Sequence, residues 1–206
     1  LGFGGDYNYN KGDFKVHGSW GSSAKGHSDN LGLFTNVGYK LNDTTILSSH
    51  LRGDSHKYSE ENLTYRLNAT KVFDNFTLSL TESTGLRHPD LYVLHGVNPS
   101  GSFKSMKTTK PETSLTRELN LKYFVSDEIS FETTAYKGSV SDVLNRGTST
   151  NGYNEIIDIK QEGLENNLIF KGDNQKLILS STLSKSREGN GRPQLRRPEK
   201  QFGINY

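Results

Sequence analysis

Six side chains in two connecting segments are the residues of this sequence best suited to hold a charged ligand. They are Arg87, His88, Tyr92, His95, Arg196 and Arg197. Guanidinium groups bind carboxylates and phosphates through charge-assisted hydrogen bonds, so both segments could contact an anionic ligand or a metal chelate. The spacing of His88 and His95, with Pro89 between them, fits no zinc site.

Other site chemistry has little support in the sequence. Asp6, Asp13 and Asp43 could bind calcium, but their scatter over different predicted turns favours solvated turn residues. The tripeptide at residues 52–54 (RGD) resembles an integrin ligand, and its short length makes chance the better explanation. Nucleophile elbows, Walker loops and paired zinc-ligand motifs are absent from the sequence. We therefore expect no catalytic residues, no bound metal and no cofactor.

The composition excludes several classes of protein. No stretch approaches the roughly 18 to 20 consecutive apolar residues of a membrane-spanning helix. The absence of Cys excludes disulfide scaffolds and thiolate metal sites. The net charge of +2, without a basic run, gives no support for a nucleic-acid partner. With 31% hydrophobic and 10% aromatic residues, the chain is too aromatic for a solvated tail but has few residues for one thick dry core.

Apolar residues alternate with polar ones along most of the chain. A period of two predicts strands with one apolar and one polar face. About eleven such stretches can be recognised, and clear examples are residues 31–41, 63–73 and 115–125. The expected fold is therefore all-β.

Short and long connections alternate between these predicted strands. The short ones are rich in Gly, Asn and Asp, which suit tight turns, and they lie at residues 10–13, 42–44, 74–75, 126–128 and 172–174. The long ones lie at residues 21–30, 53–61, 85–114, 145–154 and 186–199. This alternation predicts an up-and-down antiparallel meander with all tight turns at one end. Outer-membrane β-barrels have this layout, and their polar strand face lines a wet lumen.

Aromatic residues flank the predicted tight turns, where an outer-membrane barrel carries a girdle at the membrane interface. They are Tyr9, Phe14, Tyr39, Phe73, Phe76, Tyr123, Phe131 and Phe170. Aromatic residues are also common in ordinary strands and near hairpin ends. The girdle is the interpretation that fits the predicted meander.

Several motifs in the second half of the chain resemble those of the TonB-dependent outer-membrane receptors. Residues 85–96 (GLRHPDLYVLHG) follow the pattern G-[FL]-R-x-P-x-L-Y-x-L-x-G, and residues 110–114 (KPETS) follow K-P-E-x-S. Similar matches lie at residues 98–99 (NP), 117–123 (RELNLKY), 135–144 (AYKGSVSDVL), 162–165 (EGLE) and 195–198 (LRRP). The last of these also occurs in the vitamin B12 receptor branch and in several siderophore receptors. The resemblance covers residues 63–206.

This resemblance implies a multi-pass barrel in the cell outer membrane that imports metal chelates of the siderophore, haem or cobalamin class. Its partners would be the chelate, outer-membrane lipid, and the TonB energy-coupling complex, which acts through a plug domain. We expect residues 1–206 to be a fragment of one barrel domain, about 11 of about 22 strands, without the plug. Because the motif is regular in a family with varied ligands, residues 87–89 are expected to pack the loop against the barrel wall. Arg196 and Arg197 could bind carboxylates or phosphates, but salt bridges inside the barrel are the more common role of such residues.

Three other functions are compatible with parts of the pattern. A passive porin or an adhesin-type barrel shares the strands and needs no energy coupling. An outer-membrane barrel enzyme would need a Ser/His or Asp/His set at the loop end. A soluble sandwich would have Greek-key connections, which break the short–long alternation.

Overall fold

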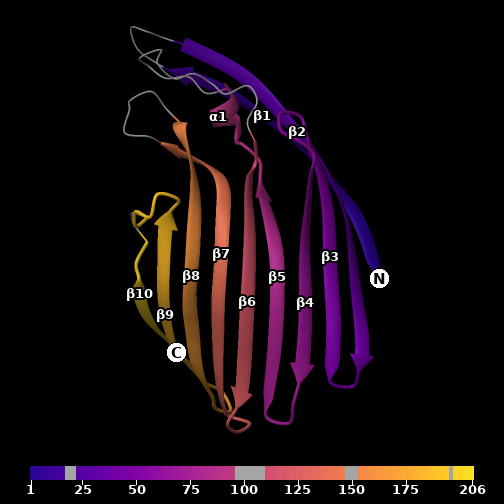
Figure 1. Ribbon diagram of the computed structural model, residues 1–206, viewed down its shortest axis with the longest axis vertical. Helices are drawn as coiled ribbons and strands as arrows, with labels where there is room; N and C mark the ends of the chain where they lie inside the picture. The colour runs from indigo at the N-terminus through magenta and orange to yellow at the C-terminus, as the bar shows by residue number, and fades with distance from the viewer. Residues whose placement is uncertain (17–21, 96–109, 147–152, 195–196) are drawn as a thin grey trace.

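The computed structural model describes residues 1–16, 22–95, 110–146, 153–194 and 197–206. Ten strands form one antiparallel sheet in which every strand pairs with its neighbours in the sequence. The strands are β1 (Gly2–Val16), β2 (Ser22–Asn42), β3 (Thr45–His56), β4 (Asn62–Val72), β5 (Phe76–Arg87), β6 (Glu112–Phe124), β7 (Ile129–Arg146), β8 (Tyr153–Lys171), β9 (Lys176–Glu188) and β10 (Lys200–Asn205). The sheet is not closed, and its two edges are β1 and β10 (Figure 1). This confirms the prediction of an all-β, up-and-down partial barrel.

The predicted tight turn at residues 10–13 is wrong. β1 runs through this segment, and its register with β2 is unbroken from the Gly2–Asn36 pair to the Val16–Ser22 pair. The ladder overrides the local turn propensity of these residues, because each residue in it satisfies backbone hydrogen bonds. Two predicted strands thus merge into one, so the described residues contain ten strands instead of about eleven. Most of the long connection predicted at residues 21–30 is likewise part of β2.

The register sorts the side chains onto two different faces. One row across β2 to β9 is mainly apolar, and it consists of Tyr39, Leu47, Ala69, Leu80, Leu119, Ala135, Leu164 and Leu183. The adjacent row points to the opposite side and is mainly polar or Gly, and it consists of Gly38, Ser48, Asn68, Thr81, Glu118, Tyr136, Gly163 and Ser184. We call these sides the apolar face and the polar face.

The two ends of the sheet differ as the sequence predicted. Tight turns at residues 43–44, 73–75, 125–128 and 172–175 lie together at one end, which we call the short-turn end (Figure 1). Aromatic residues gather there: the rings of Phe73 and Phe76 stack with centroids 4.1 Å apart, and Tyr123 pairs with Phe131 across β6 and β7. Tyr9 and Phe14 lie within β1 and do not flank a turn.

The opposite end, which we call the loop end, carries the single described helix. α1 (Leu91–His95) follows β5 and packs against β1 and β2 (Figure 1). Val93 and Leu94 of this helix are buried. No helix among the described residues is long and apolar enough to cross a membrane. The most enclosed packing therefore lies where the connection after β5 meets the first two strands.

Candidate functional site

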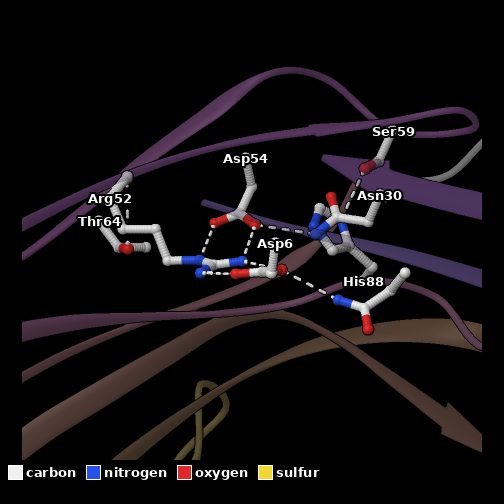
Figure 2. A network of polar contacts seen from close by, with 8 residues as sticks. Asp6, Asn30, Arg52, Asp54, Ser59, Thr64 and His88 are labelled. Carbon is white, nitrogen blue, oxygen red and sulfur yellow. Dashed lines mark hydrogen bonds and ion pairs between the residues drawn. The ribbon is translucent and has the colours of Figure 1, made fainter. Parts of the chain in front are cut away.

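An ion-pair network on the polar face, near the loop end, joins three strands. Arg52 of β3 donates to Asp54 of its own strand and to Asp6 of β1, with Arg52 Nη1 2.6 Å from Asp6 Oδ2 and Arg52 Nε 2.8 Å from Asp54 Oδ2 (Figure 2). β2 lies between β1 and β3, and Gly32 occupies the position between Asp6 and Asp54. A Cβ on Gly32 would lie 2.0 Å from Arg52 Nη2. The missing side chain is thus what lets Arg52 reach across β2.

Asp54 is the buried member of this network, with 6% of its surface exposed. It accepts hydrogen bonds from Arg52 and from Asn30 Nδ2, the latter at 2.9 Å (Figure 2). A buried carboxylate needs such charged and polar donors to offset its lost hydration. Asp6 and Asp54 together accept hydrogen bonds from Nε, Nη1 and Nη2 of Arg52. The network therefore links β1 to β3 across β2.

His88 connects the segment after β5 to this part of the wall. Its imidazole stacks on His56 with ring centroids 4.3 Å apart and planes 10° apart. His88 Nδ1 lies 2.9 Å from Ser59 Oγ, in the connection between β3 and β4 (Figure 2). Burial, followed by the neighbouring His56, lowers the pKa of His88. The neutral imidazole is therefore the form that this packing favours.

α1 begins with a side-chain cap and lies against β1. Asp90 Oδ1 accepts a hydrogen bond from the Val93 amide at 2.9 Å, which satisfies one of the free amides at the helix start. Tyr92 packs its ring edge-on against Phe14 of β1, with centroids 5.8 Å apart, and stays 43% exposed. Leu94 is fully buried. The helix is thus anchored by the Asp90 cap and by the apolar packing of Tyr92 and Leu94.

His95 lies at the end of α1, over a glycine of β2. A Cβ on Gly26 would lie 2.1 Å from His95 Cδ2, so the ring occupies the space that a side chain there would fill. Tyr58 packs edge-on against the same imidazole at 5.3 Å. Burial, with smaller contributions from His27 and Lys57, lowers the pKa of His95. Nε2 of His95 and Nε2 of His88 are both buried, with no hydrogen-bond partner among the described residues.

The remaining candidate residues are placed apart from this helix. Arg87 pairs with Glu112 across β5 and β6, with Arg87 Nη1 3.3 Å from Glu112 Oε2, and its side chain is 71% exposed. Arg197 is exposed in the connection between β9 and β10. Arg196 lies outside the described residues. The structure therefore brings together His88, Tyr92 and His95 as a docked segment, and places Arg87 at its base.

Sequence reasoning missed the most connected residues of the site. From the sequence alone, Arg52 and Asp54 are part of a tripeptide best explained by chance, and Asp6 is expected to be a solvated turn residue. Their spacing of two does place Arg52 and Asp54 on one face, but the partnership with Asp6 depends on the register of β1, β2 and β3. Within the described residues, no group of three or more His, Asp or Glu side chains could hold a metal ion.

An open meander with one apolar face, one polar face and a loop segment docked on the polar face defines part of a β-barrel wall. Residues 1–182 match the family described as TonB dependent receptor-like, beta-barrel. The chain belongs to this family, whose members are receptors and transporters. No curated protein sequence matches the chain.

Several solved structures share this fold. The ferric yersiniabactin uptake receptor FyuA from Yersinia pestis is 11% identical, with a TM-score of 0.71 over 98% of this chain and 35% of that one. The siderophore receptor PirA from Acinetobacter baumannii is 14% identical, with a TM-score of 0.70 over 98% and 40%. The copper transporter OprC is 17% identical, with a TM-score of 0.68 over 89% and 33%. The chain thus spans about a third to two fifths of these relatives.

Proposed function

We propose that this chain forms part of the wall of an outer-membrane receptor that imports a metal chelate with energy from TonB. The family match carries this proposal. The division into an apolar and a polar face supports a membrane-embedded wall around a polar lumen. The siderophore class is the preferred ligand class, because PirA is described as a siderophore receptor and FyuA as a ferric yersiniabactin uptake receptor.

The docked segment suggests how the wall takes part in ligand entry. His88, Tyr92 and His95 lie on the polar face at the loop end, where a ligand would enter the lumen. Their contacts fix α1 to β1, β2 and the connection after β3. We propose that they shape the entrance, and that the exposed parts of Tyr92 and Arg87 are the surfaces available to an incoming chelate.

An uptake assay on the complete gene in its own host tests the proposal. Radiolabelled ferric catecholate, ferric hydroxamate, haem, cobalamin and copper would be supplied to wild-type, deletion and TonB-deficient cells. Loss of uptake of one iron–siderophore complex in both mutants is the expected result. Unchanged uptake of all probes in the deletion strain would contradict it. Uptake that needs the gene but not TonB would instead identify a passive barrel.

A further inference from the structure

β4 and β5 separate from each other before they reach the loop end (Figure 1). Their register stops at the Arg66–Ser83 pair. Residues 62–65 of β4 still pair with β3, and residues 84–87 of β5 still pair with β6. In the described part of the chain, each of these two segments is therefore paired on one side only. We call the space between them the fork.

A side chain ends the pairing at the base of the fork. The Tyr65 amide donates to Thr84 Oγ1 at 2.8 Å, and the same hydroxyl donates to the Tyr65 carbonyl oxygen at 3.4 Å. The hydroxyl thus accepts the hydrogen bond that the Thr84 carbonyl would accept in a continued ladder. At the loop end of the fork, Ser59 Oγ lies 2.9 Å from His88 Nδ1. Side-chain contacts therefore bound the fork at both ends.

The backbone groups of Leu63 and Leu86 point into this fork. At the short-turn end of the same two strands, the Phe73 amide donates to the Phe76 carbonyl oxygen at 2.8 Å. Backbone groups point toward the same neighbouring strand at every second residue, and Leu63 and Leu86 are even numbers of residues from this pair. The register gives them no partner across the fork within the described residues. Two facing strand edges therefore present unpaired backbone groups to each other.

A cavity of about 230 Å³ lies in the fork. Its lining includes Leu63 and Leu86, which belong to the apolar face, and Thr64 and Gly85, which belong to the polar face. Leu63 is 70% exposed. The fork is thus open to the surroundings of the protein, and its two sides differ in polarity.

An ion pair on the apolar face separates the fork from the apolar row. Glu82 Oε2 accepts from Arg117 Nε at 2.6 Å, and Glu82 Oε1 accepts from the Tyr65 hydroxyl at 2.8 Å. Charged side chains are costly among acyl chains, and so are unpaired backbone groups. In the outer-membrane orientation proposed above, the fork therefore lies in water beyond the apolar band, where an extracellular protein can reach it.

We propose that the fork binds an extended peptide segment of an extracellular protein, which adds a strand between β4 and β5. An extended backbone supplies donors and acceptors at the same two-residue spacing as both edges. Its side chains would alternate between apolar ones toward Leu63 and Leu86 and small polar ones toward Thr64 and Gly85. The two edges would stand about 9.6 Å apart, twice the spacing of paired strands, and the ladder already ends before this point. The proposal rests on the outer-membrane location proposed above.

Peptide binding to the full-length receptor, purified in detergent, tests this site. The probe is a short fluorescein-labelled peptide of alternating Thr and Val, and fluorescence anisotropy measures its binding. A matched peptide carries N-methyl groups on every second amide, which removes the donors toward one of the two edges. We expect saturable binding of the first peptide and at least about tenfold weaker binding of the second, because strand addition depends on backbone hydrogen bonds.

Variants of the two fork edges test where the peptide binds. Leu63→Pro/Leu86→Pro removes two amide donors that face the fork and spares the ladders with β3 and β6, because those ladders use the neighbouring residues. This variant is expected to bind the peptide at least about tenfold more weakly. The matched control Leu63→Val/Leu86→Val keeps both donors and should bind as the wild type does.

A second variant tests the base of the fork without introducing proline. Thr84→Val removes the hydroxyl that ends the pairing, so the Tyr65 amide is free to bond the backbone carbonyl of residue 84 and continue the ladder. The fork then becomes shorter, and peptide binding is expected to weaken several-fold. Thr77→Val, within the paired part of β5, is the control and should not change binding.

Several results would overturn the proposal. They are the absence of saturable binding to the wild type, equal binding of the N-methylated peptide, and equal binding by the wild type and Leu63→Pro/Leu86→Pro. Hydrogen exchange gives a further check on occupancy. Protection of the Leu63 and Leu86 amides before any peptide is added would mean that the receptor's own chain fills the fork, which would also overturn it.

Chelate uptake by the same variants separates this site from the proposed function. A variant that loses peptide binding and retains uptake supports the site and leaves the import proposal intact. A receptor that binds the peptide in the fork but imports no chelate would leave the site standing and contradict the import proposal.

Discussion

Arg52 shows how a single residue can hold several strands of this wall together. Its guanidinium connects β3 to β1 across β2, and it does so because Gly32 leaves the space above β2 open. Asp54 is buried, and its charge is matched by Arg52 and Asn30. The network is thus a clamp across three strands. Without Arg52, the buried carboxylate of Asp54 would keep only Asn30 as a donor.

Removal of Arg52 should destabilise the full-length receptor. We expect Arg52→Ala to lower the free energy of unfolding by about 1–3 kcal/mol, because Asp54 keeps its burial but loses its main donor. Urea unfolding in lipid vesicles measures this difference. Arg66→Ala is the matched control, since Arg66 is on the same face of the next strand and forms no ion pair within the described residues. An equal effect of the two substitutions would contradict the clamp.

The polar contacts of the clamp could be predicted only in part from the sequence. The spacing of Arg52 and Asp54 places them on one face, and Gly32 is an ordinary strand glycine by pattern. Asp6 lies 46 residues from Arg52, so their contact requires the register of two strand pairs. That register is set by pairing over whole strands, so it cannot be predicted from a short sequence motif.

At the level of elements, we expect the docking of α1 and of His88, which precedes it, to depend on protonation. The docked helix favours neutral His88 and His95, whose pKa values are lowered by burial. An undocked histidine has the ordinary value of about 6.5, so undocking binds protons. Docking is therefore fully stable above this value and loses stability as the pH falls from it toward the lowered values.

Hydrogen exchange of residues 91–95, compared between about pH 8 and pH 5 after correction for intrinsic rates, should show this loss. We expect protection of α1 to decrease at the lower pH. His88→Gln/His95→Gln should remove most of the pH dependence, whereas His50→Gln in β3 should leave it unchanged. Equal pH dependence in all three proteins would rule out these histidines as its source.

Gly26 controls the same docking by shape. A Cβ at this position meets the His95 ring, so Gly26→Val should displace α1 while the β1–β2 ladder stays paired. Limited proteolysis within residues 91–95 is expected to become several-fold faster. Gly38→Val is the matched control on the same strand and face, because a Cβ at Gly38 has open space around it. Similar cleavage rates for both variants would mean that His95 does not hold the helix.

The elements themselves were largely predictable, with one instructive exception. Alternation over residues 31–41 or 115–125 identifies strands because the period reports which face each side chain takes. Residues 10–13 have the composition of a turn, yet they lie within β1 because fifteen consecutive pairs with β2 outweigh the local preference. The position of α1 could not be foreseen, since it depends on Phe14 of β1 and Gly26 of β2, which are distant in sequence.

For the sheet as a whole, the polarity of its two faces determines which environment, lipid or water, each face must contact. The apolar row through Leu80, Leu119 and Leu164 is exposed, and a compact soluble fold would bury such a row. The two edges of the sheet, β1 and β10, present unpaired backbone groups, which a membrane barrel has to pair with further strands. Both features fit a wall whose apolar face meets lipid and whose edges continue into the rest of a barrel.

A pair of arginine substitutions on one strand tests this orientation. Leu119 is on the apolar face of β6 and Glu118, its neighbour, is on the polar face. Leu119→Arg should make folding of the full-length receptor into lipid vesicles less favourable by about 2–4 kcal/mol, because it would place a charge among acyl chains. Glu118→Arg should change the free energy of folding by less than about 1 kcal/mol, because its side chain meets a wet lumen. Folded fractions over a urea titration measure both, and equal costs would mean that the apolar face does not contact lipid.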